Sequence, residues 1–183
     1  RWFILSDSPP EKDVQWSDTG VASANKFLQK IFNLTNLIVS RRETKTDEDM
    51  EQKFVLKINS LIIKIDNAVE NFRFNVAIAH FYEIYNFLKE KLDKKITNKV
   101  LQDSITNIMK LFIPFAPHLA YECLELLKCK TPNIWPDIDQ KNVFDEINLA
   151  VQINGKTRDI ISIEKDLDEN NINQIINKSS KAK

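Results

Sequence analysis

The stretch over residues 100–128 constrains the fold more than any other, because two prolines divide it into two helical patterns. Pro114 disfavours helical geometry at Ile113, so the first helix is expected to end there. Pro117 suits the first turn of a new helix, where its missing N–H would have had no partner. Each helix has one apolar face. The predicted faces are Leu101, Ile105, Ile108, Met109 and Phe112, then Leu119, Ala120, Cys123, Leu124 and Leu127.

Three more amphipathic helices are predicted upstream of this pair, from apolar residues recurring three or four positions apart. They are expected over residues 19–39, 46–71 and 74–92. Ser17 or Asp18 is the candidate N-cap of the first, and Thr46 with Asp49 is a weak capping box for the second. Helices with such short connections predict a mainly α fold, an antiparallel helical bundle over residues 19–128.

The chain on the N-terminal side of the bundle has no helical period. Residues 1–18 contain a short apolar run at 2–5, which Pro9 and Pro10 stop. A run this short does not distinguish a buried strand from the end of a helix. We expect residues 1–18 to be an extended or irregular connector.

The C-terminal side predicts a linker and then a β segment. Residues 129–147 carry two prolines and no period, which indicates a linker. In residues 148–183, the Asn154-Gly155 pair is a strong hairpin signal between predicted strands at 149–153 and 157–163, with a helix over 168–179. A hairpin and one helix bury too little to close a core, so we expect a truncated α+β domain.

Composition agrees with a helical fold and sets limits on charge and redox state. Two glycines in 183 residues are few for an enzyme built of sheets and loops. The formal net charge is zero, so a nucleic-acid surface must come from local patches. Cys123 and Cys129 are interpreted as reduced thiols. The apolar runs are short and interrupted, so neither a signal peptide nor a membrane span is expected.

Residues that could support catalysis or metal binding are few. The sequence has no nucleotide-binding loop, zinc spacing or nucleophile elbow. His80 is expected to be a partly exposed helix residue, and His118 to hydrogen-bond a neighbouring helix or backbone carbonyl. Glu122 and Glu125 share a helix but have no third ligand beside them, so no metal site is expected. The residues alone therefore predict a helical bundle with a β segment and no catalytic residue.

Local clusters of cations are the candidate contacts with RNA phosphates. One cluster follows the first predicted helix, one follows the third, and one adjoins the Asn-Gly turn. The alternative interpretation, that these side chains are merely solvated surface, stays open for all of them. The candidates are Arg41, Arg42 and Lys45, then Lys91, Lys94, Lys95 and Lys99, then Lys156 and Arg158.

Three motifs resemble the leucyl-tRNA synthetase family. SDSPPE at residues 6–11, with WSDTGV and NKFL after it, resembles the segment that follows the catalytic core in this family. FAPH at 115–118 resembles the helix start of the anticodon-binding bundle of class I synthetases, and VQINGKTR at 151–158 resembles the hairpin that opens the C-terminal domain. The chain departs from the family pattern at Ser23, Lys26, Lys30 and Tyr121, where glycine, arginine, arginine and glutamate are usual.

The resemblance implies the C-terminal part of an enzyme that activates leucine with ATP and Mg²⁺ and transfers it to tRNA(Leu). The catalytic motifs and the editing domain would lie upstream of Arg1, so this chain is expected to have no catalytic residue, metal or cofactor and to be inactive alone. The resemblance also implies a cytoplasmic monomer that binds tRNA(Leu). Two alternatives remain: the same bundle from a valyl or isoleucyl enzyme, and a helical protein-interaction module with no RNA role.

Overall fold

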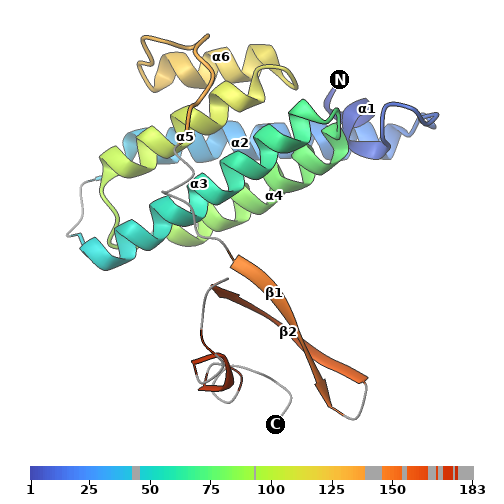
Figure 1. Cartoon of the computed structure of the whole chain (residues 1–183). Helices are drawn as coiled ribbons and strands as arrows, with labels where there is room; N and C mark the ends of the chain where they lie inside the picture. The colour runs from blue at the N-terminus through green and yellow to red at the C-terminus, as the bar shows by residue number, and fades with distance from the viewer. Residues whose placement is uncertain are drawn as a thin grey trace. The chain divides into compact units, whose positions relative to one another are not determined.

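The computed structural model describes residues 1–42, 46–92, 94–138, 146–153, 156–164, 168, 171–174 and 176. The chain divides into two compact units, Arg1–Asn142 and Val143–Lys183. The first unit is helical, and the described part of the second is mainly a β-hairpin (Figure 1).

All the helices predicted for the bundle are present, with bounds that differ from the prediction by a residue or two. The chain turns back between neighbours, and α3 and α4 lie side by side as an antiparallel pair (Figure 1). The helices are α1 (Trp2–Asp7), α2 (Asp18–Ser40), α3 (Glu48–Glu70), α4 (Phe74–Lys91), α5 (Asn98–Phe112) and α6 (Pro117–Leu126).

The prediction that residues 1–18 are extended or irregular was wrong at their start, because residues 2–7 form helix α1. The Trp2 side chain is 3% exposed and stacks on Phe112 with ring centroids 4.7 Å apart. The rings of Phe27 and Phe81 lie 5.3 and 5.8 Å away. An aromatic ring of this size buries much apolar area, so α1 is part of the bundle core and not a connector outside it.

Side-chain caps set the starts of three helices. Ser17, one of the two predicted candidates, caps α2 by accepting a hydrogen bond from the Gly20 amide at 3.1 Å. The capping box predicted at Thr46 was wrong: the carboxylate of Asp47, one residue later, accepts from the Met50 amide at 3.3 Å and so caps α3. Thr97 caps α5 in the same way. These caps satisfy amide groups that have no partner inside the helix.

The elbow between α5 and α6 follows the two prolines, although one predicted cause was wrong. Ile113 keeps helical angles, φ −52° and ψ −47°. The helix ends at Phe112 because Pro114 has no N–H to donate to the Lys110 carbonyl, which accepts instead from the Ile113 amide at 3.3 Å. Pro117 begins α6, as predicted.

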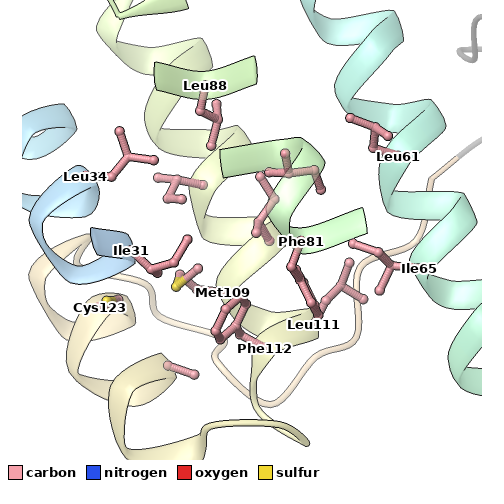
Figure 2. Packing of buried hydrophobic residues seen from close by; sticks show 14 of the residues in the cluster. Ile31, Leu34, Leu61, Ile65, Phe81, Leu88, Met109, Leu111, Phe112 and Cys123 are labelled. Atoms are coloured by element: carbon pink, nitrogen blue, oxygen red, sulfur yellow. The ribbon is translucent and has the colours of Figure 1, made fainter. Parts of the chain in front are cut away.

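Helix α5 is the centre of the first unit. It packs against α2, α3 and α6, and residues 108–112 are all buried. Figure 2 shows Met109 beside Ile31 of α2, while Leu111 approaches Ile65 of α3. The predicted apolar stripe of α5 is confirmed, but the side chains on the rest of its last turn are buried as well. Because its last turn is buried on all sides, α5 can contact three other helices at once.

The second unit contains β1 (Glu146–Ile153) and β2 (Lys156–Glu164), which pair antiparallel. Ile153 pairs with Lys156, so two residues connect the strands, as the hairpin prediction requires. Those two, Asn154 and Gly155, lie outside the described residues. Ile161 and Ile163 are buried. Residues 171–174 and 176 are helical.

Part of the segment predicted as a linker belongs to the first unit. Trp135 donates its indole N–H to the Asp66 carboxylate of α3 at 2.7 Å, and Ile138 packs against the core of the bundle. Trp135 lies in a region without hydrophobic periodicity, yet it packs on the bundle because Asp66 accepts its hydrogen bond. Hydrophobic periodicity does not reveal a contact with a residue so distant in the sequence.

Candidate nucleic-acid interface

Arg41 follows α2, and its guanidinium ties the end of that helix to the segment between α4 and α5. Nε donates to the Leu92 carbonyl at 2.8 Å, and Nη2 donates to the Lys94 carbonyl at 2.8 Å. Nη1 donates to the Ile96 carbonyl at 2.9 Å and to the Asn98 side chain at 2.6 Å. The planar fork of an arginine matches such a set of acceptors, whereas a lysine cannot. Arg41 was predicted as an RNA contact, but its donors are engaged by the chain itself.

The same segment is held from its other side by the start of α3. The Asp47 amide donates to the Lys95 carbonyl at 3.0 Å, and the Thr97 amide donates to the Glu51 carboxylate at 2.8 Å. Backbone groups of this connection are therefore paired with two different helix ends. The described residues of this connection, 92 and 94–97, are therefore held by hydrogen bonds, although they form no helix or strand.

Arg42 and four of the predicted lysines, Lys91, Lys94, Lys95 and Lys99, lie in or beside this connection, and we call this part of the bundle the basic end. Lys94, Lys95 and Lys99 are exposed, and so is Arg42. Lys91 differs, because its ammonium lies 2.8 Å from the Glu90 carboxylate and 5.4 Å from the centre of the Phe87 ring. Its hydrogen bond lowers the pKa of Glu90. The last candidate of this cluster, Lys45, lies outside the described residues.

Carboxylates at the start of α3 also lie at the basic end, and three of them have a partner within the chain. Glu51 accepts the Thr97 amide and Asp47 caps α3. Asp49 pairs with Lys53 at 2.7 Å, a contact that raises the pKa of Lys53. Acidic side chains in the first turn of α3 also interact favourably with the positive end of that helix.

The hairpin candidates occupy the start of β2. Lys156 pairs with Ile153 at the end of the ladder. Thr157 pairs with Gln152 and Asp159 with Val151, so Arg158 is the extra residue of a β-bulge. The structure describes the backbone of Lys156 and Arg158 but not their side chains. Since the two units are described separately, these residues are not combined with the basic end into one site.

Two cations on α2 were missed as candidates, although the sequence contains a signal for them. Lys26 and Lys30 are exposed, one turn apart. Residues 19–42 contain four cations and no carboxylate. On this helix, Asn25, Gln29 and Asn33 border a groove of about 380 Å³ between α2 and α6. A helix face with cations and amides but no acid is compatible with nucleic acid along its length.

The histidines, glutamates and thiols do not assemble a reactive centre among the described residues. His80 is part-exposed and lies 3.2 Å from the Glu83 carboxylate. His118 is exposed and makes no hydrogen bond within the described chain, so the bond predicted for it was wrong. No set of three or more metal-ligating side chains converges there, and no described helix is long and apolar enough to cross a membrane.

Cys123 is buried, and burial raises the pKa of its thiol. Cys129 is half-buried, and both cysteines are free thiols, as predicted. A thiol with a raised pKa is rarely a thiolate at neutral pH and is therefore a poor nucleophile.

The chain folds into a helical bundle with a basic end, and a small β unit follows the bundle in the sequence. Residues 51–173 match the family described as the anticodon-binding domain of tRNA ligase. Because this match covers more than half of the 183 residues, the chain belongs to that family. The mainly α bundle predicted from the helical periods is the fold of this family.

Leucine–tRNA ligases are among the relatives of this chain. It is 35% identical to that of Hyphomonas neptunium over 173 residues, which covers 91% of the chain and 20% of the relative. It is 30% identical to that of Thermotoga maritima, covering 96% of the chain and 23% of the relative. The chain thus spans roughly a fifth of the relatives it matches.

A solved structure also resembles the chain. It is a ternary complex of an Agrobacterium radiobacter K84 leucyl-tRNA synthetase with tRNA and LeuAMS. The TM-score is 0.72 at 28% identity, and the likeness covers 96% of this chain and 24% of that one. These findings confirm the predicted resemblance to the leucyl-tRNA synthetase family.

Proposed function

We propose that this chain is the tRNA-binding portion of a leucine–tRNA ligase and that its bundle holds tRNA(Leu) while other parts of the ligase perform catalysis. The basic end, in a chain of the anticodon-binding domain family, carries the proposal. The named relatives are leucine enzymes, which favours leucine over valine or isoleucine.

The geometry of the basic end supports contact with a phosphate backbone. Lys94 and Lys95 extend from a segment whose carbonyls are tied to Arg41 and to the Asp47 amide. Cations on a preordered backbone lose less conformational entropy on binding than cations on a free loop. We therefore assign Arg41 the role of a positioning residue, and Arg42, Lys94, Lys95 and Lys99 the phosphate contacts.

The exposed face of α2 extends this surface. From Lys26 to Ser40, the last residue of α2, the helix rises by roughly 21 Å, at about 1.5 Å for each residue. Several phosphates of one RNA strand fit along this length. We propose that Lys26 and Lys30 contact the same RNA that the basic end binds.

Salt dependence of tRNA(Leu) binding tests this proposal. Each neutralised phosphate contributes a log–log slope of roughly −0.7 to −0.9. Replacing Lys94, Lys95 and Lys99 by Gln is expected to flatten the slope by about one unit for each lost contact, and adding Arg42→Gln by about one more. Fluorescence anisotropy of labelled tRNA(Leu), measured from low to moderate salt, gives these slopes.

The control is a variant with the same change of charge at exposed positions elsewhere, Lys12, Lys64 and Lys130 to Gln. Its slope is expected to stay close to that of the wild type. Equal flattening in both variants would mean that only total charge matters and would remove the basic end from the proposal. No tRNA binding even at low salt would leave the alternative of a protein-interaction module.

The remaining parts of the proposal concern the whole ligase. ATP and Mg²⁺ would act in the parts of the relatives that lie outside the matched fifth. We propose a cytoplasmic monomer, in keeping with the free thiols Cys123 and Cys129. Lys156 and Arg158 are proposed as a second tRNA contact, supported by their place at the tip of the hairpin ladder.

A further inference from the structure

Residues 131–135 fold back onto the bundle and are fastened there by two side-chain hydrogen bonds. The Trp135 indole N–H donates to the Asp66 carboxylate at 2.7 Å. The Tyr121 hydroxyl donates to the Asn133 side-chain oxygen at 2.6 Å. Beneath this segment lies a hollow of about 140 Å³ lined by Lys110, residues 113–114 and residues 132–135, which we call the Trp135 hollow.

Lys110 is an unusual lining residue for such a hollow. It lies in the last turn of α5, is 9% exposed, and its ammonium has no hydrogen bond or ion pair within the described chain. Among the described residues, the one side-chain nitrogen or oxygen that is both fully buried and without a partner is Trp2 Nε1. The Lys110 ammonium, which also has no partner, is therefore not fully buried and can be reached from solvent. An ammonium without an anionic partner among the described residues can hold an anion that enters the hollow, through a charge-assisted hydrogen bond.

The other walls of the hollow suit a flat apolar group. Trp135 is 40% exposed, and its bond to Asp66 holds the ring in place. Proline and isoleucine side chains complete the wall. The volume is close to that of a cavity of about 150 Å³ known to hold one benzene ring. Arg1 donates to the Pro114 carbonyl at 3.2 Å, which brings a second cation near this wall.

An anion beside a single flat ring is the chemistry of a pyrimidine nucleotide. We propose that the Trp135 hollow binds one pyrimidine nucleotide of an RNA, with the base against Trp135 and the phosphate on the Lys110 ammonium. Aromatic side chains commonly stack on unpaired bases in this way. The inference rests on the proposed function for its RNA, but the hollow lies apart from the residues of the basic end.

Nuclear magnetic resonance of the indole N–H groups tests the hollow directly. In the 183-residue chain labelled with ¹⁵N-tryptophan, the Trp135 signal is identified by its absence in Trp135→Phe. Addition of UMP is expected to shift this signal in a saturable way. Uridine, which lacks the phosphate, is expected to bind about tenfold more weakly, because it loses a charge-assisted hydrogen bond. Inorganic phosphate alone should bind more weakly than UMP as well.

Variants separate the charge of Lys110 from its packing. Lys110→Met keeps most of the buried stem and is expected to weaken UMP about tenfold, whereas Lys110→Arg should retain it. Lys130→Met removes an exposed lysine next to this segment, which does not line the hollow, and should leave UMP affinity unchanged. Equal UMP affinity in Lys110→Met and the wild type would overturn the inference, as would no saturable shift with millimolar UMP.

Other ligands give outcomes that reassign the hollow or separate the two proposals. An acetylated, amidated glutamate that shifts Trp135 as strongly as UMP would assign the hollow to a carboxylate partner and overturn the nucleotide. If tRNA(Leu) binds but does not shift Trp135, the inference fails while the proposed function stands. If UMP binds and tRNA(Leu) does not, the hollow stands and the proposed function fails.

Discussion

At the scale of single residues, Arg41 and Arg42 are neighbours with different tasks. Arg41 is half-buried and engages three backbone carbonyls and the Asn98 side chain, while Arg42 is exposed. In return, Asn98 donates its side-chain amide to the Arg41 carbonyl at 2.6 Å. A pair of adjacent arginines in the sequence indicates only charge. The acceptors of Arg41 lie more than fifty residues further along the chain, so no local pattern identified them.

Replacing Arg41 by Lys is expected to lower the free energy of unfolding by about 1.5–3 kcal/mol, because a single ammonium cannot replace the fork on several acceptors. Chemical denaturation measures this change. Hydrogen exchange at the Ile96 and Thr97 amides should also speed up, since the Arg41 contacts hold that segment. The matched variant Arg42→Lys should stay within about 0.5 kcal/mol of the wild type. If Arg41→Lys and Arg42→Lys had the same free energy of unfolding, Arg41 would not have the proposed positioning role.

Lys110 and Trp2 show the same limit of local patterns. The periodicity of α5 placed its apolar stripe correctly, and every residue of that predicted stripe is buried. It did not indicate that Lys110, outside the stripe, is buried too. Trp2 was part of a run too short to interpret, yet its ring lies among Phe27, Phe81 and Phe112. Both cases depend on elements that surround a position from several sides.

At the scale of elements, the contact between α1 and α2 depends on a glycine. A Cβ at Gly20 would lie 2.5 Å from Cε2 of the Phe3 ring. Gly20 stands in the first turn of α2, where an alanine would otherwise favour the helix. The close approach of α1 therefore explains a residue that helix propensity alone would disfavour.

A double-mutant cycle separates these two effects. Gly20→Ala alone is expected to destabilise the chain by about 1–3 kcal/mol, the usual cost of overpacking. In a Phe3→Ala background the same change should be neutral or stabilising by up to about 1 kcal/mol, because only the gain in helix propensity remains. Denaturant midpoints of the four proteins give the coupling. If Gly20→Ala costs the same in both backgrounds, the contact with Phe3 is not the reason for the glycine.

Elements with a long apolar period were the ones that sequence predicted well. Helices α2 to α6 each present such a period, and the hairpin has alternating residues on both sides of its turn. Their ends were predicted less accurately, because caps compete over neighbouring positions, as Thr46 and Asp47 do at α3. The bulge at Arg158 and the docking of Trp135 arise from pairing with other segments. A single period cannot encode either feature.

At the scale of the whole molecule, the two units differ in how their backbone is supported. In the first, α5 contacts three other helices and contributes a fully buried last turn. In the described part of the second, each strand pairs with one neighbour. A two-stranded hairpin is marginally stable without further packing. We therefore expect the hairpin to open at a lower free energy than the bundle and independently of it.

Native-state hydrogen exchange distinguishes independent opening from a single cooperative unit. Amides of α5 such as those of Ile105 and Ile108 should exchange only on global unfolding of the bundle, with strong dependence on denaturant. Amides of β1 and β2 should exchange faster and depend less on denaturant. Ile163→Ala, at a buried position of β2, should speed exchange in the hairpin and leave α5 unchanged.

The reciprocal variant completes the experiment. Ile105→Val is expected to destabilise the bundle by about 0.5–1.5 kcal/mol and to reduce protection in α5 by that amount. Hairpin amides should keep their exchange rates, because their opening does not require the bundle to unfold. Should both variants instead shift both sets of amides equally, the chain unfolds as one unit. The weak local support of β1 and β2 would then be compensated by contacts from outside the strands.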